Sequence, residues 1–308
     1  MRFLLTGSSG FIGQYLAQHL RQSGHAVYTL NARIFNSQRQ QEWLDYLCEV
    51  RPTAIIHLAG LAHRQLPSTL DSCRYLRAVN VDYPVSLAGI AAQADVPRFV
   101  FVSSIGVHGA QTPIGVPFRE DSPFNPGNPY AESKCEAEHR LQALLASTTT
   151  QLVIVRPALV SGRGAPGNVN RLARLVHLGL PLPFANVDNQ RSFVVIENLC
   201  DLLARAAIHP HAGNQAFLAA EAHTPSTAEV VACMARYWGR RPRLWSCPQK
   251  PLRLLLQWAG YQAQAGQLLG SVVVDSSKAR QLIGWQPIKP LELSLYESAE
   301  LDVKPVWS

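Results

Sequence analysis

The chain has 308 residues, of which 47% are hydrophobic and 16% charged, and its 28 basic and 21 acidic side chains give a net charge of +7. Globular proteins usually carry about 25% charged residues, so this composition indicates a large hydrophobic core and excludes a disordered chain. The 20 glycines and 21 prolines follow no period, and no segment approaches the ~18 consecutive apolar residues that cross a bilayer, which excludes collagen and membrane insertion.

The basic residues are scattered without a run of five, which favours an anionic small molecule over nucleic acid as the partner. The six cysteines form no Cys-x-x-Cys pair, and the first residues lack the apolar run of a secretory signal. We therefore expect a cytoplasmic enzyme without a metal site. Residues 251–258 have the pattern of an amphipathic membrane-surface helix, but the segment is short enough that packing on the protein is favoured.

Apolar runs and helical spacings alternate along the first half of the chain. They predict, in order, a strand at 2–6, a helix at 11–21, a strand at 26–30, a helix near 40–50, a strand at 53–58, a helix at 70–94, a strand at 98–102, a helix at 129–147 and a strand at 152–155. This alternation predicts an α/β fold, a Rossmann-like doubly wound parallel sheet with helices on both faces. Short elements separated by prolines follow, so we expect one domain at 1–160 and a smaller α/β substrate lobe at 161–308, partly interleaved with it.

Three glycines, Gly7, Gly10 and Gly13, lie between the first predicted strand and the first predicted helix. A dinucleotide-binding turn needs one glycine where the chain turns, one where the backbone meets the diphosphate, and one where helix and strand pack closely. The N–H groups at the start of the helix then face the anion. An ordinary glycine-rich turn is the alternative, but the position at the start of an α/β chain favours a dinucleotide.

The residues after the second predicted strand bear on which dinucleotide is bound. NAD sites commonly place a carboxylate there, whereas this chain has Asn31 and Arg33. Asn31 is suited to a ribose hydroxyl and Arg33 to a 2′-phosphate, so we expect NADP or NAD, with a modest preference for NADP. A solvated loop position is an equally weighted alternative for Arg33.

A helix is predicted to begin at Asn128 and Pro129, which places Tyr130 and Lys134 four residues apart on one face. An ammonium beside the phenol lowers the phenol's pKa and prepares it to exchange a proton with a sugar hydroxyl or ketone. The chain has only five lysines, so a chance pairing is less attractive. Ser104 follows the strand at 98–102, at the edge where α/β sheets bind ligands, although such a serine can also simply cap a strand.

Together these motifs resemble the extended short-chain dehydrogenases/reductases. The resemblance rests on Gly7-x-x-Gly10-x-x-Gly13, His57-Leu58-Ala59-Gly60, Val102-Ser103-Ser104, Pro129-Tyr130-Ala131-Glu132-Ser133-Lys134 and Arg156-Pro157, in this order. The segments 191–199, 275–278 and 284–287 are similar to those of the nucleotide-sugar epimerase, dehydratase and reductase group, so the resemblance covers nearly the whole chain.

The resemblance implies a role for each matching position. Ser104 and Tyr130 would bracket the reacting sugar oxygen, and Lys134 would also bind the nicotinamide ribose. Further cofactor contacts would come from Phe11, Ile12, Leu58, Ala59, Gly60 and Pro157. A UDP-sugar substrate would be bound by Asn80, Ser104, Asn168 and Arg191, the last of these on its diphosphate, with a surface ion pair as the alternative for Arg191. Family members are often homodimers through a pair of helices, here 70–94 and 129–147.

This chain departs from the family pattern in ways that bear on the reaction. His108 replaces the usual tyrosine, Ala131 stands where glycine is frequent, and the short stretch between Leu30 and Thr53 lacks room for a third strand. Dehydratases of the group carry Asp-Glu after the catalytic hydroxyl residue, where this chain has Ile105-Gly106, so a dehydratase is disfavoured.

The choice between a reductase and an epimerase depends on how the cofactor is held. An epimerase must retain it through both half-reactions, whereas the short Leu30–Thr53 stretch suggests an exchangeable one. The sequence narrowly favours an NAD(P)-dependent 4-reductase of a UDP-4-keto-6-deoxy-N-acetylhexosamine in O-antigen or capsule synthesis. A UDP-glucose or UDP-N-acetylglucosamine 4-epimerase is the alternative. A non-catalytic dinucleotide sensor is disfavoured by the intact Ser104, Tyr130 and Lys134.

Overall fold

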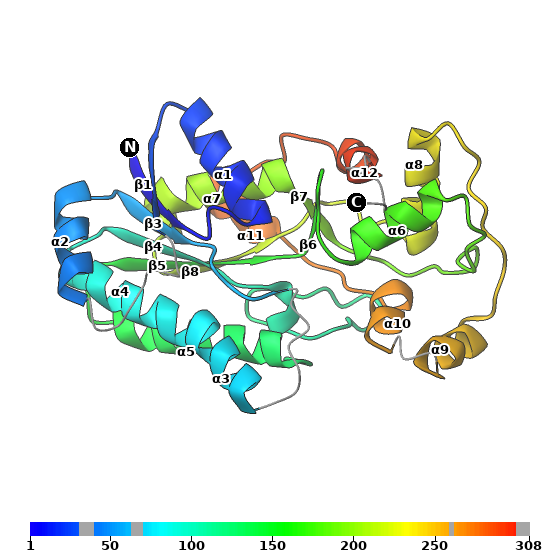
Figure 1. The fold of residues 1–308 in the computed structure, drawn as a ribbon, viewed down its shortest axis with the longest axis horizontal. Helices are drawn as coiled ribbons and strands as arrows, with labels where there is room; N and C mark the ends of the chain where they lie inside the picture. The colour runs from blue at the N-terminus through cyan, green and yellow to red at the C-terminus, as the bar shows by residue number, and fades with distance from the viewer. Residues whose placement is uncertain (31–39, 63–69, 259–261, 300–308) are drawn as a thin grey trace, which may run out of the picture.

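A six-stranded parallel sheet forms the centre of the computed structural model, which describes residues 1–30, 40–62, 70–258 and 262–299 (Figure 1). Its strands lie in the order β2-β1-β3-β4-β5-β8. They are β1 (Arg2–Thr6), β2 (Ala26–Leu30), β3 (Ala54–His57), β4 (Arg98–Val102), β5 (Gln151–Pro157) and β8 (Gln215–Ala219). The chain moves from β1 outward to β2 and then returns to the other side of β1. The carboxyl ends of β1 and β3 therefore flank a topological switch point, where such sheets bind ligands. The predicted doubly wound fold is confirmed.

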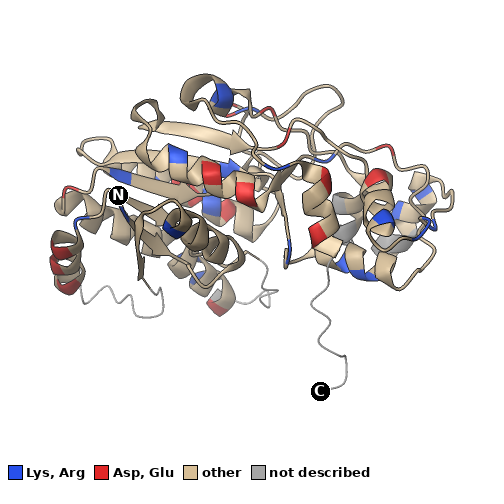
Figure 2. Cartoon of the chain, turned by 90° about the horizontal axis from the view of Figure 1, so that it is seen from above, with Lys and Arg blue, Asp and Glu red and all other residues tan. Residues whose placement is uncertain are grey.

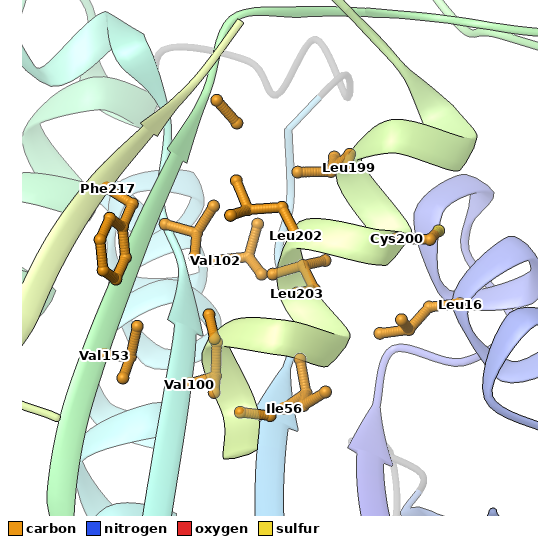
Figure 3. Packing of buried hydrophobic residues seen from close by; sticks show 14 of the residues in the cluster. Leu16, Ile56, Val100, Val102, Val153, Leu199, Cys200, Leu202, Leu203 and Phe217 are labelled. Atoms are coloured by element: carbon orange, nitrogen blue, oxygen red, sulfur yellow. The ribbon is translucent and has the colours of Figure 1, made fainter. Parts of the chain in front are cut away.

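Helices cover both faces of this sheet because successive strand residues point to opposite sides. Phe3 and Leu5 enter one hydrophobic cluster, and Leu4 enters the other. The first cluster includes side chains of α1 (Phe11–Gln22), α7 (Ile196–Ile208) and α11 (Ser277–Ile283), and the second includes those of α2 (Gln40–Val50), α4 (Tyr83–Gln93) and α5 (Pro129–Leu145). Figure 3 shows the side chains of α7 packed over those of the central strands.

The helix predicted at 70–94 is present as an uninterrupted helical segment over 70–93, but it contains a π-helical turn that the spacing did not predict. A π-helical turn, Ala78–Asp82, joins α3 (Leu70–Arg77) to α4. The N–H of Tyr83 donates to the carbonyl of Ala78, five residues back. Pro84 has no N–H with which to satisfy the carbonyl of Asn80. Such turns often occur at functional sites, and this one carries the fully buried Asn80.

A second, smaller layer lies beyond the carboxyl ends of the strands. The parallel pair β6 (Leu159–Ser161) and β7 (Phe193–Val195) packs with α6 (Asn168–His177), α8 (Thr227–Tyr237) and α12 (Leu291–Ala299) around a core of its own. The helices α9 (Gln249–Trp258) and α10 (Gln262–Leu269) lie at the outer end of this lobe (Figure 1). The division at residue 160 stays a prediction, and β8, α7 and α11 belong to the main sheet layer although they follow that residue. In the part of the chain that the structure describes, no helix is long and apolar enough to cross a membrane.

Asn198 of α7 holds the segment after α11 against the main sheet layer. Its Oδ1 accepts hydrogen bonds from the N–H groups of Ile288 and Lys289, both at 2.9 Å. Its Nδ2 donates to Oε1 of Glu221 at 2.7 Å and to the carbonyl of Lys289 at 2.8 Å. The fully buried Trp285 donates from Nε1 to the carbonyl of Asn198 at 3.2 Å. One buried amide therefore has all four of its hydrogen-bonding positions filled.

We expect Asn198→Ala to lower the free energy of unfolding by about 3 kcal/mol, because each buried group left without its partner costs about 1–3 kcal/mol. Urea unfolding followed by tryptophan fluorescence measures the change. The control is Asn186→Ala, which removes an exposed asparagine, and we expect it to alter the same quantity by less than about 0.5 kcal/mol. Equal destabilisation by both substitutions would contradict the role of Asn198.

Candidate active site

The turn between β1 and α1 carries the three glycines of the predicted cofactor site. Gly7 has φ +70°, and a Cβ added there would lie 2.6 Å from the backbone N of Ala59. A Cβ on Gly13 would lie 2.2 Å from the carbonyl oxygen of Gly7, so neither position has room for a side chain. Gly10 is the N-cap of α1 and offers no side-chain hydrogen bond, which leaves the first N–H groups of the helix available to an anion. This turn fits the diphosphate of a dinucleotide.

The other predicted cofactor residues lie along the same edge of the sheet. Phe11 and Ile12 begin α1, Leu58, Ala59 and Gly60 follow β3, and Pro157 ends β5. A Cβ on Gly60 would lie 3.3 Å from Oδ1 of Asn80 and 3.4 Å from Nζ of Lys134, so the segment after β3 reaches the catalytic candidates. Individual cofactor contacts stay predictions, and Asn31 and Arg33 fall outside the described residues.

Helix α5 begins as predicted and places Lys134 next to the carboxyl end of β4. The side chain of Asn128 accepts a hydrogen bond from the N–H of Ala131 at 2.9 Å, and Pro129 is the first helical residue. Lys134 is buried, and its Nζ donates to the carbonyl of Val102, the last residue of β4, at 2.9 Å. The helix that carries Tyr130 is thereby joined to the strand that precedes Ser104.

Ser104 lies beside the first turn of α5. Its Oγ accepts a hydrogen bond from the N–H of Gly106 at 3.1 Å. A Cβ on Gly106 would lie 3.4 Å from that Oγ and 3.7 Å from Cβ of Ala131, the residue after Tyr130. The structure therefore brings the segments that carry Ser104, Tyr130 and Lys134 together at the carboxyl end of β4.

The pKa values of this cluster differ from the sequence prediction. Burial lowers the pKa of Lys134 to about 8, and its ammonium lies 4.5 Å from the centroid of the Phe101 ring. Burial raises the pKa of the Tyr130 phenol to about 12. The prediction that Lys134 lowers the phenol's pKa is therefore wrong for the protein without nucleotide, because desolvation of the phenol raises the pKa. Tyr130 is therefore protonated at neutral pH.

Asn80 connects the π-helical turn to the turn that carries Tyr130. Its Oδ1 accepts from the N–H of Leu61 at 2.8 Å, and its Nδ2 donates to Oγ of Ser133 at 2.9 Å. The Ser133 hydroxyl donates in turn to the carbonyl of Tyr130 at 2.7 Å. Asn80 thus positions the start of α5, while its predicted contact with substrate stays a prediction.

A buried ion pair between Glu138 of α5 and Arg156 of β5 lies next to the segments that carry the predicted catalytic residues. Nε of Arg156 donates to both oxygens of Glu138 at 3.1 Å, and Nη2 donates to Oε2 at 2.6 Å. Both side chains are at most 3% exposed. Arg156 was noted in the sequence only as part of the Arg156-Pro157 motif, and Glu138 was missed. The signal that could have identified Glu138 is its position four residues after Lys134, on the same helix face.

His108 extends this ion pair to the loop that follows Ser104. Nη1 of Arg156 donates to Nε2 of His108 at 2.9 Å and to the carbonyl of Glu120 at 2.9 Å. A guanidinium only donates, so His108 accepts on Nε2 and carries its proton on Nδ1, which lies 3.3 Å from the carbonyl of Pro123. Burial and the neighbouring Arg156 lower the pKa of His108, which keeps the ring neutral. The residue that departs from the family pattern therefore links β5 to the loop after Ser104.

Arg191 lies in the smaller lobe beside residues 270–274. Its Nη1 donates to the carbonyl of Gly270 at 3.3 Å, and burial lowers its pKa to about 10. No carboxylate of the described residues forms an ion pair with this guanidinium, so the alternative of a surface ion pair has no support among them. The residue after Gly270, Ser271, accepts from the N–H of Thr112, which lies in the loop after Ser104, at 2.9 Å. A half-buried cation in this position is suited to an anionic ligand.

The last predicted substrate residue, Asn168, also lies in the smaller lobe. It is the first residue of α6 and follows the N-cap Gly167, which has φ +81°. Its contact with substrate stays a prediction.

A family model, described as the NAD dependent epimerase/dehydratase family, matches residues 3–220. A UDP-glucose 4-epimerase of Vibrio cholerae is 33% identical to this chain over 96% of this chain and 94% of that protein. A UDP-glucose 4-epimerase of Mycolicibacterium smegmatis is 28% identical over 97% of this chain and 98% of that protein. The crystal structure of a Thermus thermophilus UDP-glucose 4-epimerase in complex with NAD shares the fold, with a TM-score of 0.75 at 22% identity over 97% of this chain and 98% of that chain. From the family match, the near full-length relatives and the glycine turn beside Ser104, Tyr130 and Lys134, we conclude that the chain belongs to the NAD dependent epimerase/dehydratase family.

Proposed function

We propose that this protein is an NAD-dependent 4-epimerase of a UDP-hexose or UDP-N-acetylhexosamine. The observation that carries the proposal is the placement of the segments with Ser104, Tyr130 and Lys134 at the carboxyl end of the parallel sheet. The half-buried guanidinium of Arg191 lies in the smaller lobe beyond this edge. The two relatives described above are both UDP-glucose 4-epimerases, which supports a reaction at C4.

Each residue of the cluster has a distinct chemical task in this reaction. When bound, NAD supplies a site that takes a hydride from C4 of the sugar and gives it back. Tyr130 exchanges the proton of the C4 hydroxyl, and Ser104 hydrogen-bonds the same oxygen. Lys134, whose pKa of about 8 leaves it mostly charged at neutral pH, binds the nicotinamide ribose.

Arg191 provides the anchor that inversion at C4 requires. The keto sugar must turn its other face toward the hydride while the rest of the substrate stays bound. A guanidinium can hold a diphosphate with two parallel hydrogen bonds, and this one is half-buried and held by the carbonyl of Gly270. The diphosphate would stay fixed in the smaller lobe while the sugar rotates.

A 4-reductase of a UDP-4-keto-6-deoxy-N-acetylhexosamine is the second candidate. Two observations favour it. The Tyr130 phenol is protonated, which is the state that donates a proton to a ketone during reduction. No carboxylate follows β2 in positions 31–33, which suits an exchangeable NADPH.

Tyr130→Phe should lower turnover by about a hundredfold or more while NAD still binds, because the substitution removes only the hydroxyl that exchanges the proton. Steady-state kinetics and calorimetric titration with NAD measure the two effects. Tyr237→Phe, which alters a tyrosine of α8, is the control and should leave both unchanged. Near-normal turnover of Tyr130→Phe would refute the assignment.

Arg191→Ala should raise KM for the UDP-sugar at least about tenfold, since a charged hydrogen bond contributes about 1.5–3 kcal/mol. The dissociation constant for NAD should change less than about twofold, because only the sugar's diphosphate is proposed to meet this guanidinium. Arg205→Ala, which removes an exposed arginine paired with Asp201, serves as the control. If the two ligands were affected equally, Arg191 would lie at a different part of the site.

The cofactor balance separates the two candidate functions. An epimerase should interconvert UDP-glucose and UDP-galactose, or the N-acetyl sugars, with no net change in NADH absorbance. Product formation is followed by chromatography of the UDP-sugars while absorbance is recorded in the same sample. Stoichiometric consumption of NADPH with a UDP-4-keto sugar, and no interconversion of UDP-hexoses, would replace the epimerase by the reductase.

A further inference from the structure

Positive charge is concentrated in one segment of the smaller lobe. Between Glu229 and Asp275 the chain contains no acidic residue but six basic ones: Arg236, Arg240, Arg241, Arg243, Lys250 and Arg253. Six of the seven net positive charges of the whole chain therefore fall in this segment, and the remainder of the protein is almost neutral. Only Arg236 among the six is paired with a carboxylate of the described residues, that of Glu292 at 3.2 Å.

The segment forms the outer end of the smaller lobe, away from the main sheet. In Figure 1 the chain leaves α8, runs along the end of the lobe as an extended connection and enters α9. Figure 2 shows the blue segments of Lys and Arg gathered at this end. Arg240, Arg241, Arg243 and Arg253 are all exposed, and of these Arg240 and Arg243 donate to the carbonyls of His177 and Gly179, at the end of α6.

Apolar side chains lie exposed among these charges, on one face of α9. Lys250, Leu254 and Trp258 are four residues apart and so share a face of the helix. Leu254 is 66% exposed and Trp258 is 89% exposed. On the opposite side Leu252 is buried in the core of the smaller lobe, which attaches the helix and turns the other face to solvent. The sequence prediction that this segment packs on the protein therefore holds for Leu252, whereas Leu254 and Trp258 are left uncovered.

We propose that this end of the protein is a docking surface for an anionic lipid bilayer. We call it the basic end face and define it by Arg241, Trp245, Lys250, Arg253, Leu254 and Trp258. Tryptophan and leucine at the tip of a surface helix enter the boundary between headgroups and acyl chains, and the surrounding basic groups attract anionic headgroups. Each Lys or Arg at such a surface strengthens binding by about fivefold. The attachment is peripheral and does not depend on the proposed epimerase reaction.

The composition of the basic end face favours a bilayer over other occupants. A nucleic acid would use the basic groups, but its phosphate backbone has no place for Leu254. A second copy of this chain would bring like charges together. An anionic lipid surface can pair with the basic groups and can also cover the apolar side chains of Leu254 and Trp258.

A series of contacts connects helix α9 of the basic end face to Arg191. Helix α9 packs against α10, and Gly270, just after α10, has its carbonyl bonded to the Arg191 guanidinium. A Cβ on Gly270 would lie 2.8 Å from the side-chain nitrogen of Gln111, in the loop after Ser104. The docking surface is therefore connected to the segment that holds Arg191 and lies on the lobe that does not carry the dinucleotide-binding turn.

Sedimentation with sucrose-loaded vesicles tests the proposal on the full chain. The vesicles contain phosphatidylcholine alone or phosphatidylcholine with phosphatidylglycerol. We expect binding at least about tenfold tighter with the anionic lipid at low salt. Most of that gain should be lost in ~0.5 M salt, where the screening length falls to about 4 Å. Absence of any preference for the anionic vesicles would overturn the proposal.

Matched pairs of variants locate the binding surface. Lys250→Glu with Arg253→Glu should weaken vesicle binding by about 25-fold or more, whereas Arg21→Glu with Arg74→Glu makes the same change in net charge elsewhere and should have much less effect. Leu254→Ser with Trp258→Ser should weaken binding at least about tenfold, and Leu293→Ser with Ile288→Ser, at positions 50% and 58% exposed, should not. Circular dichroism and thermal unfolding establish that each variant is folded, and NAD binding should be unchanged in all four.

Equal loss in both members of a matched pair would show that net charge or general hydrophobicity governs binding, and would overturn the assignment to the basic end face. A labelled single-stranded oligonucleotide tests the other class of ligand by fluorescence anisotropy. Binding of the oligonucleotide that Lys250→Glu with Arg253→Glu abolishes, without binding to anionic vesicles, would replace the bilayer by nucleic acid.

Discussion

The buried ion pair between Arg156 and Glu138 holds together the three segments from which the candidate active site is built. Arg156 belongs to β5, Glu138 to the helix of Tyr130 and Lys134, and the bond from Arg156 to His108 reaches the loop after Ser104. A charge left alone in such a place costs several kcal/mol, so the three segments are held in one arrangement. Lys134 occupies the same buried layer and depends on the same arrangement for its bond to Val102.

Burial also accounts for the protonation states of the site. The Tyr130 phenol and the Lys134 ammonium both lose hydration, which favours the neutral form of each group. Burial therefore raises the pKa of Tyr130 and lowers the pKa of Lys134. The protein without nucleotide therefore holds Tyr130 as a proton donor. In the proposed reaction the positive charge of oxidised NAD and the ribose hydroxyls would join this buried layer.

The main sheet layer and the smaller lobe contribute different groups to the proposed binding of ligands. The sheet edge holds the glycine turn and the predicted catalytic residues, while the smaller lobe supplies Arg191 and most of the net charge. Residues 270–274 connect them, because they bond to the loop after Ser104 on one side and to Arg191 and Ser192 on the other. In this arrangement a ligand held by Arg191 lies against the same segment that supports the catalytic loop.

The sequence by itself was sufficient for features that depend on near neighbours. Alternation of apolar runs located the first five strands of the sheet, the spacing of Gly7, Gly10 and Gly13 identified the turn, and Asn128 with Pro129 marked the start of α5. Spacing also placed Tyr130 and Lys134 on one helix face, because four residues complete about one helical turn. The sequence did not predict the π-helical turn at Ala78–Asp82 within the helix at 70–94, because the tertiary contacts of Asn80 accompany this turn.

Only the tertiary structure decided the partners of the charged groups. Lys134 bonds to Val102, Glu138 to Arg156 and Asn80 to Ser133, and the members of these pairs are 32, 18 and 53 residues apart. Local periodicity in the sequence cannot identify contacts between residues so far apart in the chain. The same is true of the pKa of Tyr130, since desolvation depends on every segment packed around the phenol. The sequence therefore determined which chemical groups the site contains, and the packing of distant segments determined their charge and their bonding.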